Sequence, residues 1–252
     1  MFNIKKNATL LIGALILGGC SANDMDISAG MDLLKAGTVT NKEMKSMAHL
    51  AAKESDHQNR VASRGNRYSR RLRRLTRRFH RVGNLRLNYK VYMTNDVNAF
   101  AMADGTVRVY KGLMDKMNDS ELLFVIGHEI GHVKYEHTKN AYRMSHATLA
   151  ARKVLVSKGG RSVALLSRGD AGDLAQKLVN AQFSQSQESE ADKNGLYFLR
   201  RAHRNQKYAV SALKKLAEEG SGGGFLGNLF ASHPAPLKRA EDIQAMIKKG
   251  KR

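Results

Sequence analysis

Hydrophobic and polar positions alternate with two different periods along the chain, and the change of period divides it into predicted helices and strands. From Asn41 to about Val82 the period is helical, with apolar residues three or four positions apart at Tyr68, Leu72, Leu75, Phe79 and Val82. From Leu85 to Met93 apolar and polar residues alternate, which predicts a strand with one buried face. Residues 100–103 and 106–110 flank Asp104-Gly105, a dipeptide that favours a tight hairpin turn.

The rest of the chain shows helical patterning with short interruptions. Asn118 and Glu121 form a capping box, which predicts a helix from Glu121 to about His137. Further helices are predicted over about 148–156 and 173–201, and a last basic helix follows the glycine-rich loop at 221–224 and begins at about Pro236. We therefore expect one mostly helical α+β domain over residues 41–252. Its small sheet lies around 85–110, and the hairpin at 100–110 is expected to supply an edge strand for an extended peptide.

The first twenty residues have the pattern of an export signal. Lys5 and Lys6 precede a ten-residue apolar run, which is too short to span a bilayer and fits a signal peptide over residues 1–19. The sequence Leu17-Gly18-Gly19-Cys20 resembles the lipobox of bacterial lipoproteins, which predicts lipidation of Cys20; the alternative is an ordinary signal peptide with a chance cysteine. Residues 20–40 are then a lipidated tether. Because Ser21 and not aspartate follows the cysteine, the sorting rule for such lipoproteins predicts the bacterial outer membrane, with the domain in the periplasm.

Composition adds an excess of positive charge. The chain has 42% hydrophobic and 26% charged residues, which is typical of a globular protein, and its single cysteine excludes an internal disulfide. Lys and Arg number 43 against 22 Asp and Glu, a formal net charge of +21. Many arginines lie between Arg67 and Arg81, where they form either the solvated face of a packed helix or a surface for an anionic membrane. Nucleic acid is a poor candidate partner for an exported protein.

The predicted helix after Asn118 carries the sequence His128-Glu129-Ile130-Gly131-His132. Two histidines four positions apart lie on one face of a helix and can reach the same metal ion. Glu129 lies about 100° round the helix, where it can act as a general base beside that metal. Two imidazoles and one carboxylate with an open position are the ligands of catalytic Zn²⁺, so the motif predicts one zinc ion per chain.

The motif leaves the third metal ligand open. His137 lies roughly 140° round the helix from His132, off the metal face, so we expect it at a supporting contact or on the surface. A second predicted helix carries Glu188 and Asp192 on one face. Glu188 can complete the zinc site and Asp192 can accept the second N–H of a histidine ligand, while Glu190 fits an ordinary solvated position.

These residues resemble the HtpX/CAAX-protease superfamily of zinc metallopeptidases, and within it the lipid-anchored periplasmic branch. The resemblance covers about residues 91–239 and includes the HEIGH sequence, the run Phe183 to Asp192, and Ser232-His233-Pro234 followed by Arg239. It implies a gluzincin-like zincin fold with zinc held by His128, His132 and Glu188. It further implies Glu129 as catalytic base, Asp192 in support, and His233 and Arg239 beside the active site, where they can stabilise an oxyanion.

The resemblance implies a zinc metalloendopeptidase that hydrolyses unfolded or damaged cell-envelope proteins, with envelope assembly factors as further partners. Two positions depart from the family pattern: Gln185, where the family often has arginine, bears on the support around Glu188, and Ala103-Asp104, where it often has Pro-Gly, bears on substrate preference. Two alternatives stay open: an envelope lipoprotein chaperone or assembly factor, and an anionic-surface binding module, each with little proteolysis. An intact Glu129 argues against a pure binding protein, which has no need of a base.

Overall fold

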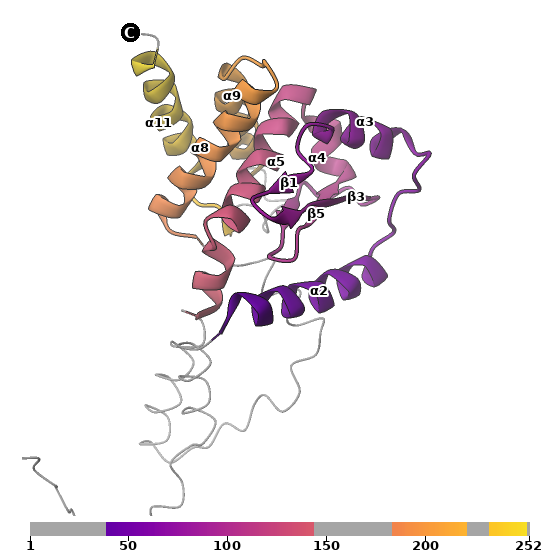
Figure 1. Ribbon diagram of the computed structural model, residues 1–252. Helices are drawn as coiled ribbons and strands as arrows, with labels where there is room; N and C mark the ends of the chain where they lie inside the picture. The colour runs from indigo at the N-terminus through magenta and orange to yellow at the C-terminus, as the bar shows by residue number, and fades with distance from the viewer. Residues whose placement is uncertain (1–38, 144–182, 221–231, 251–252) are drawn as a thin grey trace, which may run out of the picture.

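The computed structural model describes residues 39–143, 183–220 and 232–250, and within these ranges it confirms a mostly helical α+β protein (Figure 1). The helices are α2 (Asn41–Gln58), α3 (Arg67–Thr76), α4 (Lys111–Lys116), α5 (Asp119–Lys134), α8 (Gln185–Arg201), α9 (Lys207–Gly220) and α11 (Pro236–Lys249). The strands are β1 (Arg81–Val82), β2 (Leu85–Arg86), β3 (Asn88–Tyr92), β4 (Ala99–Ala101) and β5 (Thr106–Tyr110). No helix in these ranges is both long and apolar enough to cross a bilayer.

The strands form two small sheets. β1 and β2 pair as an antiparallel ribbon, and the larger sheet has the order β3-β5-β4, with β3 parallel and β4 antiparallel to β5. The hairpin predicted at Asp104-Gly105 joins β4 to β5 and is confirmed. The expectation of an edge strand over 100–110 holds only for β4, because β5 pairs on both sides and lies in the centre of the sheet.

Helices cover both faces of the larger sheet. Below it in Figure 1 runs α2, whose Met44 and Ala48 pack with Tyr92, Phe100 and Met102. Above it, α5 lies at the centre of the main core and packs against α8 and α9, and α9 in turn packs against α11. All residues of α5 from Ser120 to His132 are buried, so its metal-binding motif lies in the interior of the protein.

Local sequence signals fix the ends of the two central helices. Asn118 accepts hydrogen bonds from the backbone of Ser120 and Glu121, and Glu121 accepts one from Asn118 N–H, so the predicted capping box is confirmed. A second capping box, between Ser184 and Gln187, begins α8. α5 ends at Lys134, earlier than predicted, because Glu136 adopts a left-handed conformation (φ 57°) that a helix cannot continue through.

Several predicted elements differ from the structure. The helical stretch predicted from Asn41 to about Val82 is two helices, α2 and α3, because a bridge between Val61 and Tyr92 holds the segment between them against β3. Arg81 and Val82 belong to a strand. The sequence did not predict α4 and α9 as helices. The predictions for residues 1–38, 148–156, 173–182 and 221–224 lie outside the described residues.

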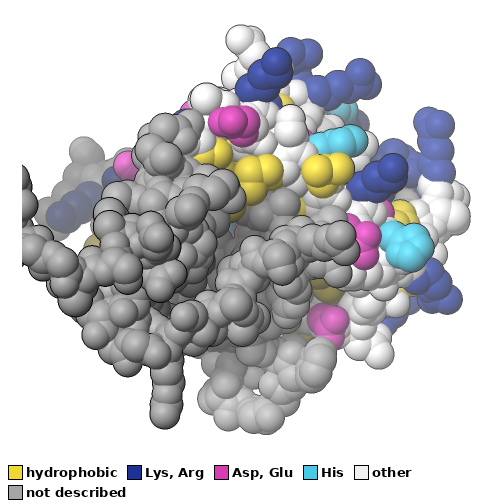
Figure 2. Space-filling view, turned by 90° about the horizontal axis from the view of Figure 1, so that it is seen from below, with side chains coloured by type: hydrophobic (Ala, Val, Ile, Leu, Met, Phe, Trp, Pro, Cys, Tyr) yellow, Lys and Arg dark blue, Asp and Glu magenta, His cyan; other side chains and the backbone are white. Residues whose placement is uncertain are grey.

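The arginines of α3 make more internal contacts than either interpretation of the sequence expected. Arg71 donates to Asp119 Oδ1 (2.7 Å) and to the carbonyl oxygens of Met114 and Met117, and Arg74 pairs with the other oxygen of Asp119. Arg71 thereby joins α3 to the end of α4 and the start of α5. Seen from below in Figure 2, Lys and Arg side chains are spread along the rim of the described part, with acidic side chains and histidines between them.

An ion pair between the partly buried Asp56 and the buried Arg108 fastens α2 to the sheet. Asp56 accepts hydrogen bonds from Arg108 Nε (2.7 Å), Lys90 Nζ (2.7 Å) and Tyr92 Oη (2.9 Å). Arg108 is only 2% exposed. Burial opposes ionisation of Asp56, but the hydrogen bonds from Arg108 and Lys90 outweigh it and lower the pKa of Asp56 to about 2.

Replacing Asp56 by asparagine should destabilise the protein, because Arg108 would stay buried without a counter-charge. We expect a loss of about 3 kcal/mol in the free energy of unfolding, measured by urea denaturation, against a negligible change for Glu54→Gln. Since the folded pKa is lowered, the contribution is full above the unfolded value near pH ~4 and is lost as the pH falls through about 2. An equal effect of the two substitutions would contradict this account.

Candidate metal centre and active site

The site lies where α5 and α8 cross at very short range. A Cβ atom on Gly131 would lie 2.8 Å from Ala191 Cα, and one on Gly127 would lie 2.7 Å from Phe198 Cγ. On the other helix, a Cβ on Gly195 would lie 2.6 Å from the Phe124 ring. At distances under 3.0 Å, an added Cβ would force its neighbours to shift. Asn194 Nδ2 also donates to the carbonyl oxygen of Gly127 (2.6 Å), so the crossing is fixed by packing and by a buried hydrogen bond.

This crossing brings four side chains of metal-binding type to one point. His128 and His132 come from α5, Glu188 from α8, and His233 from the segment before α11; all are buried, and their ligand atoms lie within 4.8 Å of one another. His132 Nε2 lies 3.1 Å from His128 Nε2, and Glu188 Oε1 lies 3.4 Å from His132 Nε2. The three ligands predicted from the sequence therefore meet in space. His233 joins them, whereas the sequence placed it only beside the site.

The contacts of His128 indicate which of its two ring nitrogens carries the proton and which directs a lone pair at the cluster. His128 Nδ1 lies 2.9 Å from Asp192 Oδ1, where the sequence predicted such a partner. A carboxylate can only accept, so Nδ1 carries the proton and a neutral His128 presents the lone pair of Nε2 to the cluster. Burial lowers the pKa of His132 well below its usual range, so that imidazole is neutral as well.

The chemistry of this group fits a divalent metal ion. Two imidazole nitrogens and a carboxylate converge in a buried space. Without a cation between them, their lone pairs would face one another, which is unfavourable. Burial opposes the charged form of Glu188, yet His128, His132 and His233 hold its pKa far below the usual range, so it is a carboxylate. Nitrogen and carboxylate ligands in this number are typical of zinc.

Arg239 reaches the site from α11 and supports its carboxylates. Its Nε donates to Asp192 Oδ2 (2.9 Å), its Nη2 donates to Asp192 Oδ1 (2.6 Å), and its Nη1 pairs with Glu188 Oε2. Burial alone would lower the pKa of Arg239, but Asp192 and Glu188 raise it. The guanidinium group is thus held between two acidic side chains of α8, which fixes their orientation.

Glu129 lies beside the cluster and lines a pocket. Among the described residues its buried Oε1 accepts no hydrogen bond, and His233 Nε2 lies 3.6 Å away. Burial raises the pKa of Glu129. Burial also disfavours protonated His233, but Glu129 and Glu188 outweigh this and raise its pKa. A buried carboxylate oxygen that accepts no hydrogen bond from the described residues, on a group whose pKa is raised, is suited to take a proton.

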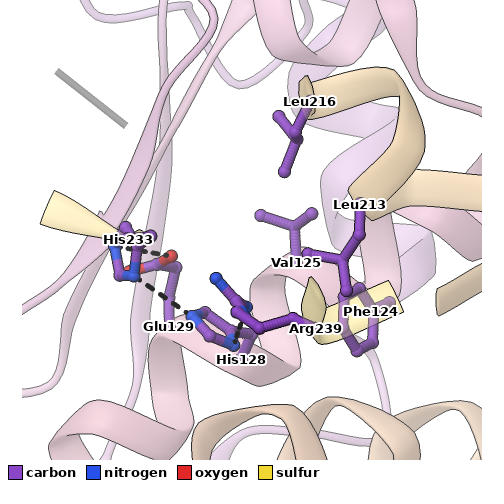
Figure 3. A pocket seen from close by; sticks show the side chains of 8 residues that line it. All are labelled: Phe124, Val125, His128, Glu129, Leu213, Leu216, His233 and Arg239. Carbon is purple, nitrogen blue, oxygen red and sulfur yellow. Dashed lines mark hydrogen bonds and ion pairs between the residues drawn. The ribbon is translucent and has the colours of Figure 1, made fainter. Parts of the chain in front are cut away.

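Figure 3 shows a pocket between this polar group and an apolar wall. His128, Glu129, His233 and Arg239 line one side. The other side is formed by side chains from α5 and α9, namely Phe124, Val125, Leu213 and Leu216. An apolar wall beside Glu129 lowers the local dielectric and accounts for the burial that raises the Glu129 pKa.

The comparisons with known proteins agree with this geometry. A model of peptidase family M48 matches residues 62–247, and the chain belongs to that family. It is 39% identical over 249 residues to the metalloprotease YcaL of Escherichia coli K12, covering 98% of this chain and 96% of the relative. It is 38% identical over 236 residues to the metalloprotease LoiP of the same organism, covering 92% of each.

A more distant relative, a protease HtpX homolog of Fusobacterium nucleatum, is 27% identical over 201 residues, which is 64% of this chain and 63% of that protein. The resemblance drawn from the sequence motifs is confirmed. The protein is a metallopeptidase that acts on peptide substrates, and this interpretation is supported over the chaperone and surface-binding alternatives.

Sequence reasoning missed one contact at the site: the Phe183 ring stacks on His132, with ring centroids 3.8 Å apart. Of the two positions expected for His137, the structure shows the supporting contact and not the surface, because its ring is buried against His132. The helical projection that placed His137 away from the metal face does not apply, because α5 ends at Lys134. The positive φ of Glu136, which redirects the chain, has no signal in the local sequence.

Replacing Gly131 by alanine should separate α5 from α8, because the new Cβ would meet Ala191 Cα. We expect a loss of about 1–3 kcal/mol in the free energy of unfolding and a weaker affinity for a divalent metal, measured by chelator competition. Gly65→Ala is the matched control, since nothing lies within 4 Å of its added Cβ. Unchanged metal affinity in Gly131→Ala would show that the helix spacing does not set the site geometry.

Proposed function

We propose that this metallopeptidase is a zinc metalloendopeptidase in which His128, His132 and Glu188 hold zinc and Glu129 is the catalytic base. The observation that carries the proposal is the convergence of two imidazoles and a carboxylate in one buried group. Glu129 lies beside this group with a buried oxygen that accepts no hydrogen bond from the described residues. The two imidazoles and the Glu188 carboxylate can bind a cation, and Glu129 can accept a proton.

When bound, zinc supplies Lewis-acid chemistry: it polarises a carbonyl group and acidifies water. Glu129 takes a proton from the attacking water and delivers it to the amine that leaves when the peptide bond breaks. The apolar wall of Val125, Leu213 and Leu216 limits hydration of the Glu129 carboxylate. The raised pKa of Glu129 lies closer to the working pH than that of an ordinary glutamate. This favours both uptake of the proton from water and its delivery to the leaving amine.

His233 and Arg239 receive different roles. His233 presents Nδ1 to Glu188 Oε1 (2.9 Å) and Nε2 to the Glu129 side, where an N–H can stabilise negative charge that develops on a carbonyl oxygen. The donors of Arg239 are directed at Asp192 and Glu188, and its Nη2 also lies 3.2 Å from His128 Nδ1. These contacts favour a supporting role for Arg239 over the oxyanion role expected from the sequence, and Asp192 fixes the His128 ring.

The β4 edge is the proposed binding strand for substrate. Tyr110 N–H donates to Asn98 and Met102 N–H to Thr106, so in the alternating antiparallel register Ala99 and Ala101 direct their backbone groups away from β5. The Ala99 N–H donates to Asn98 Oδ1 (2.8 Å), so an extended peptide would pair through its main chain with Ala101 and with the carbonyl oxygen of Ala99. Such pairing requires an extended chain and depends little on the side chains of the substrate. It therefore suits unfolded or damaged proteins as substrates.

The location is proposed from the amino-terminal sequence. Residues 1–19 are a signal peptide, Cys20 is lipidated, and residues 20–40 tether the peptidase domain of residues 41–252 to the periplasmic side of the bacterial outer membrane. In this location the substrates are proteins of the cell envelope, and envelope assembly factors are candidate partners. The single cysteine directly after two glycines and an apolar run supports the proposal.

Glu129→Gln should retain zinc but lose peptide hydrolysis by a factor of about 10² or more, because an amide cannot accept the proton of water. Zinc content is measured by elemental analysis and hydrolysis with an unfolded protein substrate. His132→Ala should lose zinc, whereas His57→Ala, which changes an exposed histidine of α2, should retain it. Hydrolysis by Glu129→Gln within a few-fold of wild type would assign the base elsewhere.

Cys20→Ala should release the protein from membranes into the periplasmic fraction, because it removes the proposed site of the lipid anchor. Fractionation of cells followed by detection of the protein measures this. Ser21→Ala, which leaves the cysteine in place, is the control and should stay with the membranes. If Cys20→Ala still sediments with membranes after a high-salt wash, lipidation is not the main attachment.

A further inference from the structure

His137 touches the metal group without belonging to it. Its side chain is only 2% exposed, which agrees with the supporting contact that the sequence allowed and not with a surface position. The left-handed conformation of Glu136 changes the direction of the chain, and residues 137–143 are helical again. This turn places the His137 ring at the Nδ1 edge of His132, whereas Nε2 of His132 is directed at His128.

Two contacts define the state of the His137 ring. His137 Nδ1 lies 3.0 Å from His132 Nδ1, and His137 Nε2 lies 3.0 Å from Glu190 Oε2. Glu190 is a carboxylate on α8 and can only accept, so Nε2 of a neutral His137 carries the proton. Its Nδ1 then has a lone pair and accepts the N–H of His132 Nδ1.

The consequence appears at the other nitrogen of His132. With its proton on Nδ1, a neutral His132 directs the lone pair of Nε2 at His128 Nε2, 3.1 Å away, and toward Glu188. His128 is held in the same tautomer by direct contact with Asp192. Both histidines are thus oriented by acidic residues of α8, one directly and the other through a second imidazole.

We infer that His137 is a positioning residue for the proposed metal ligand His132, and that Glu190 in turn orients His137. The inference rests on the proposed function, because it assumes that His132 Nε2 binds the metal. It also gives Glu190 a contact beyond the solvated position expected from the sequence, although its side chain remains 52% exposed. The ring of Tyr135 stacks on His137, with centroids 5.7 Å apart, and helps to hold it.

The test uses the full-length protein and zinc itself, with zinc affinity measured by competition against a chromophoric chelator. His137→Phe keeps a ring beside Tyr135 but removes the acceptor for His132, and it should lower zinc affinity about 10- to 100-fold. His137→Asn places an amide oxygen near the position of Nδ1, where it can accept from His132. Its zinc affinity should lie within about 3-fold of wild type, a much smaller change than the loss expected when the orienting partner is missing. His57→Phe is the matched control on the exposed side of α2.

The thermal unfolding of each metal-free variant is measured in parallel, so that a loss of fold is seen separately from a loss of affinity. Wild-type affinity in His137→Phe, or an equal loss in the Phe and Asn variants, would overturn the inference. His132→Ala distinguishes this from failure of the proposed function. If His132→Ala also binds zinc like wild type, the ligand assignment itself is wrong; if it alone loses zinc, only the role of His137 is wrong.

Discussion

The close crossing of α5 and α8 is the constraint on which the site depends, since neither helix carries a complete metal-binding group. Gly127 and Gly131 on one helix and Gly195 on the other leave no space for a Cβ, so the two backbones are in direct contact. At this distance the imidazoles of one helix reach the carboxylates of the other. The glycines therefore serve the chemistry through packing, although none of them takes part in it.

Electrostatic balance at the crossing depends on partners from three separate elements. α8 contributes acidic side chains, α5 contributes imidazoles, and α11 brings the buried guanidinium of Arg239 to Asp192 and Glu188. Each charge is costly to bury alone, and each is stabilised by the others. The Asp56–Arg108 pair follows the same rule on the opposite face of the sheet, where it holds α2.

Local sequence signals predicted the features that lie within one element. The spacing of His128, Glu129 and His132 predicts a shared helix face, and the capping box at Asn118 predicts where that helix starts. The Asp104-Gly105 turn predicts the hairpin of β4 and β5. Glu188 and Asp192 were found by the same one-turn spacing on a second helix, and the structure places both beside His128.

The sequence by itself determined the chemical groups of this protein and the helix faces that carry them, because helical periodicity and capping act over a few residues. Only the tertiary structure decided which groups meet. In the folded protein β5 is the central strand and β4 an edge strand. Arg71 and Arg74 bind Asp119 at the start of α5, and Arg239 lies between the carboxylates of Asp192 and Glu188. The tertiary structure also ended α5 at Lys134 and turned His137 onto His132. These outcomes depend on packing between segments far apart in the chain, which no local pattern encodes.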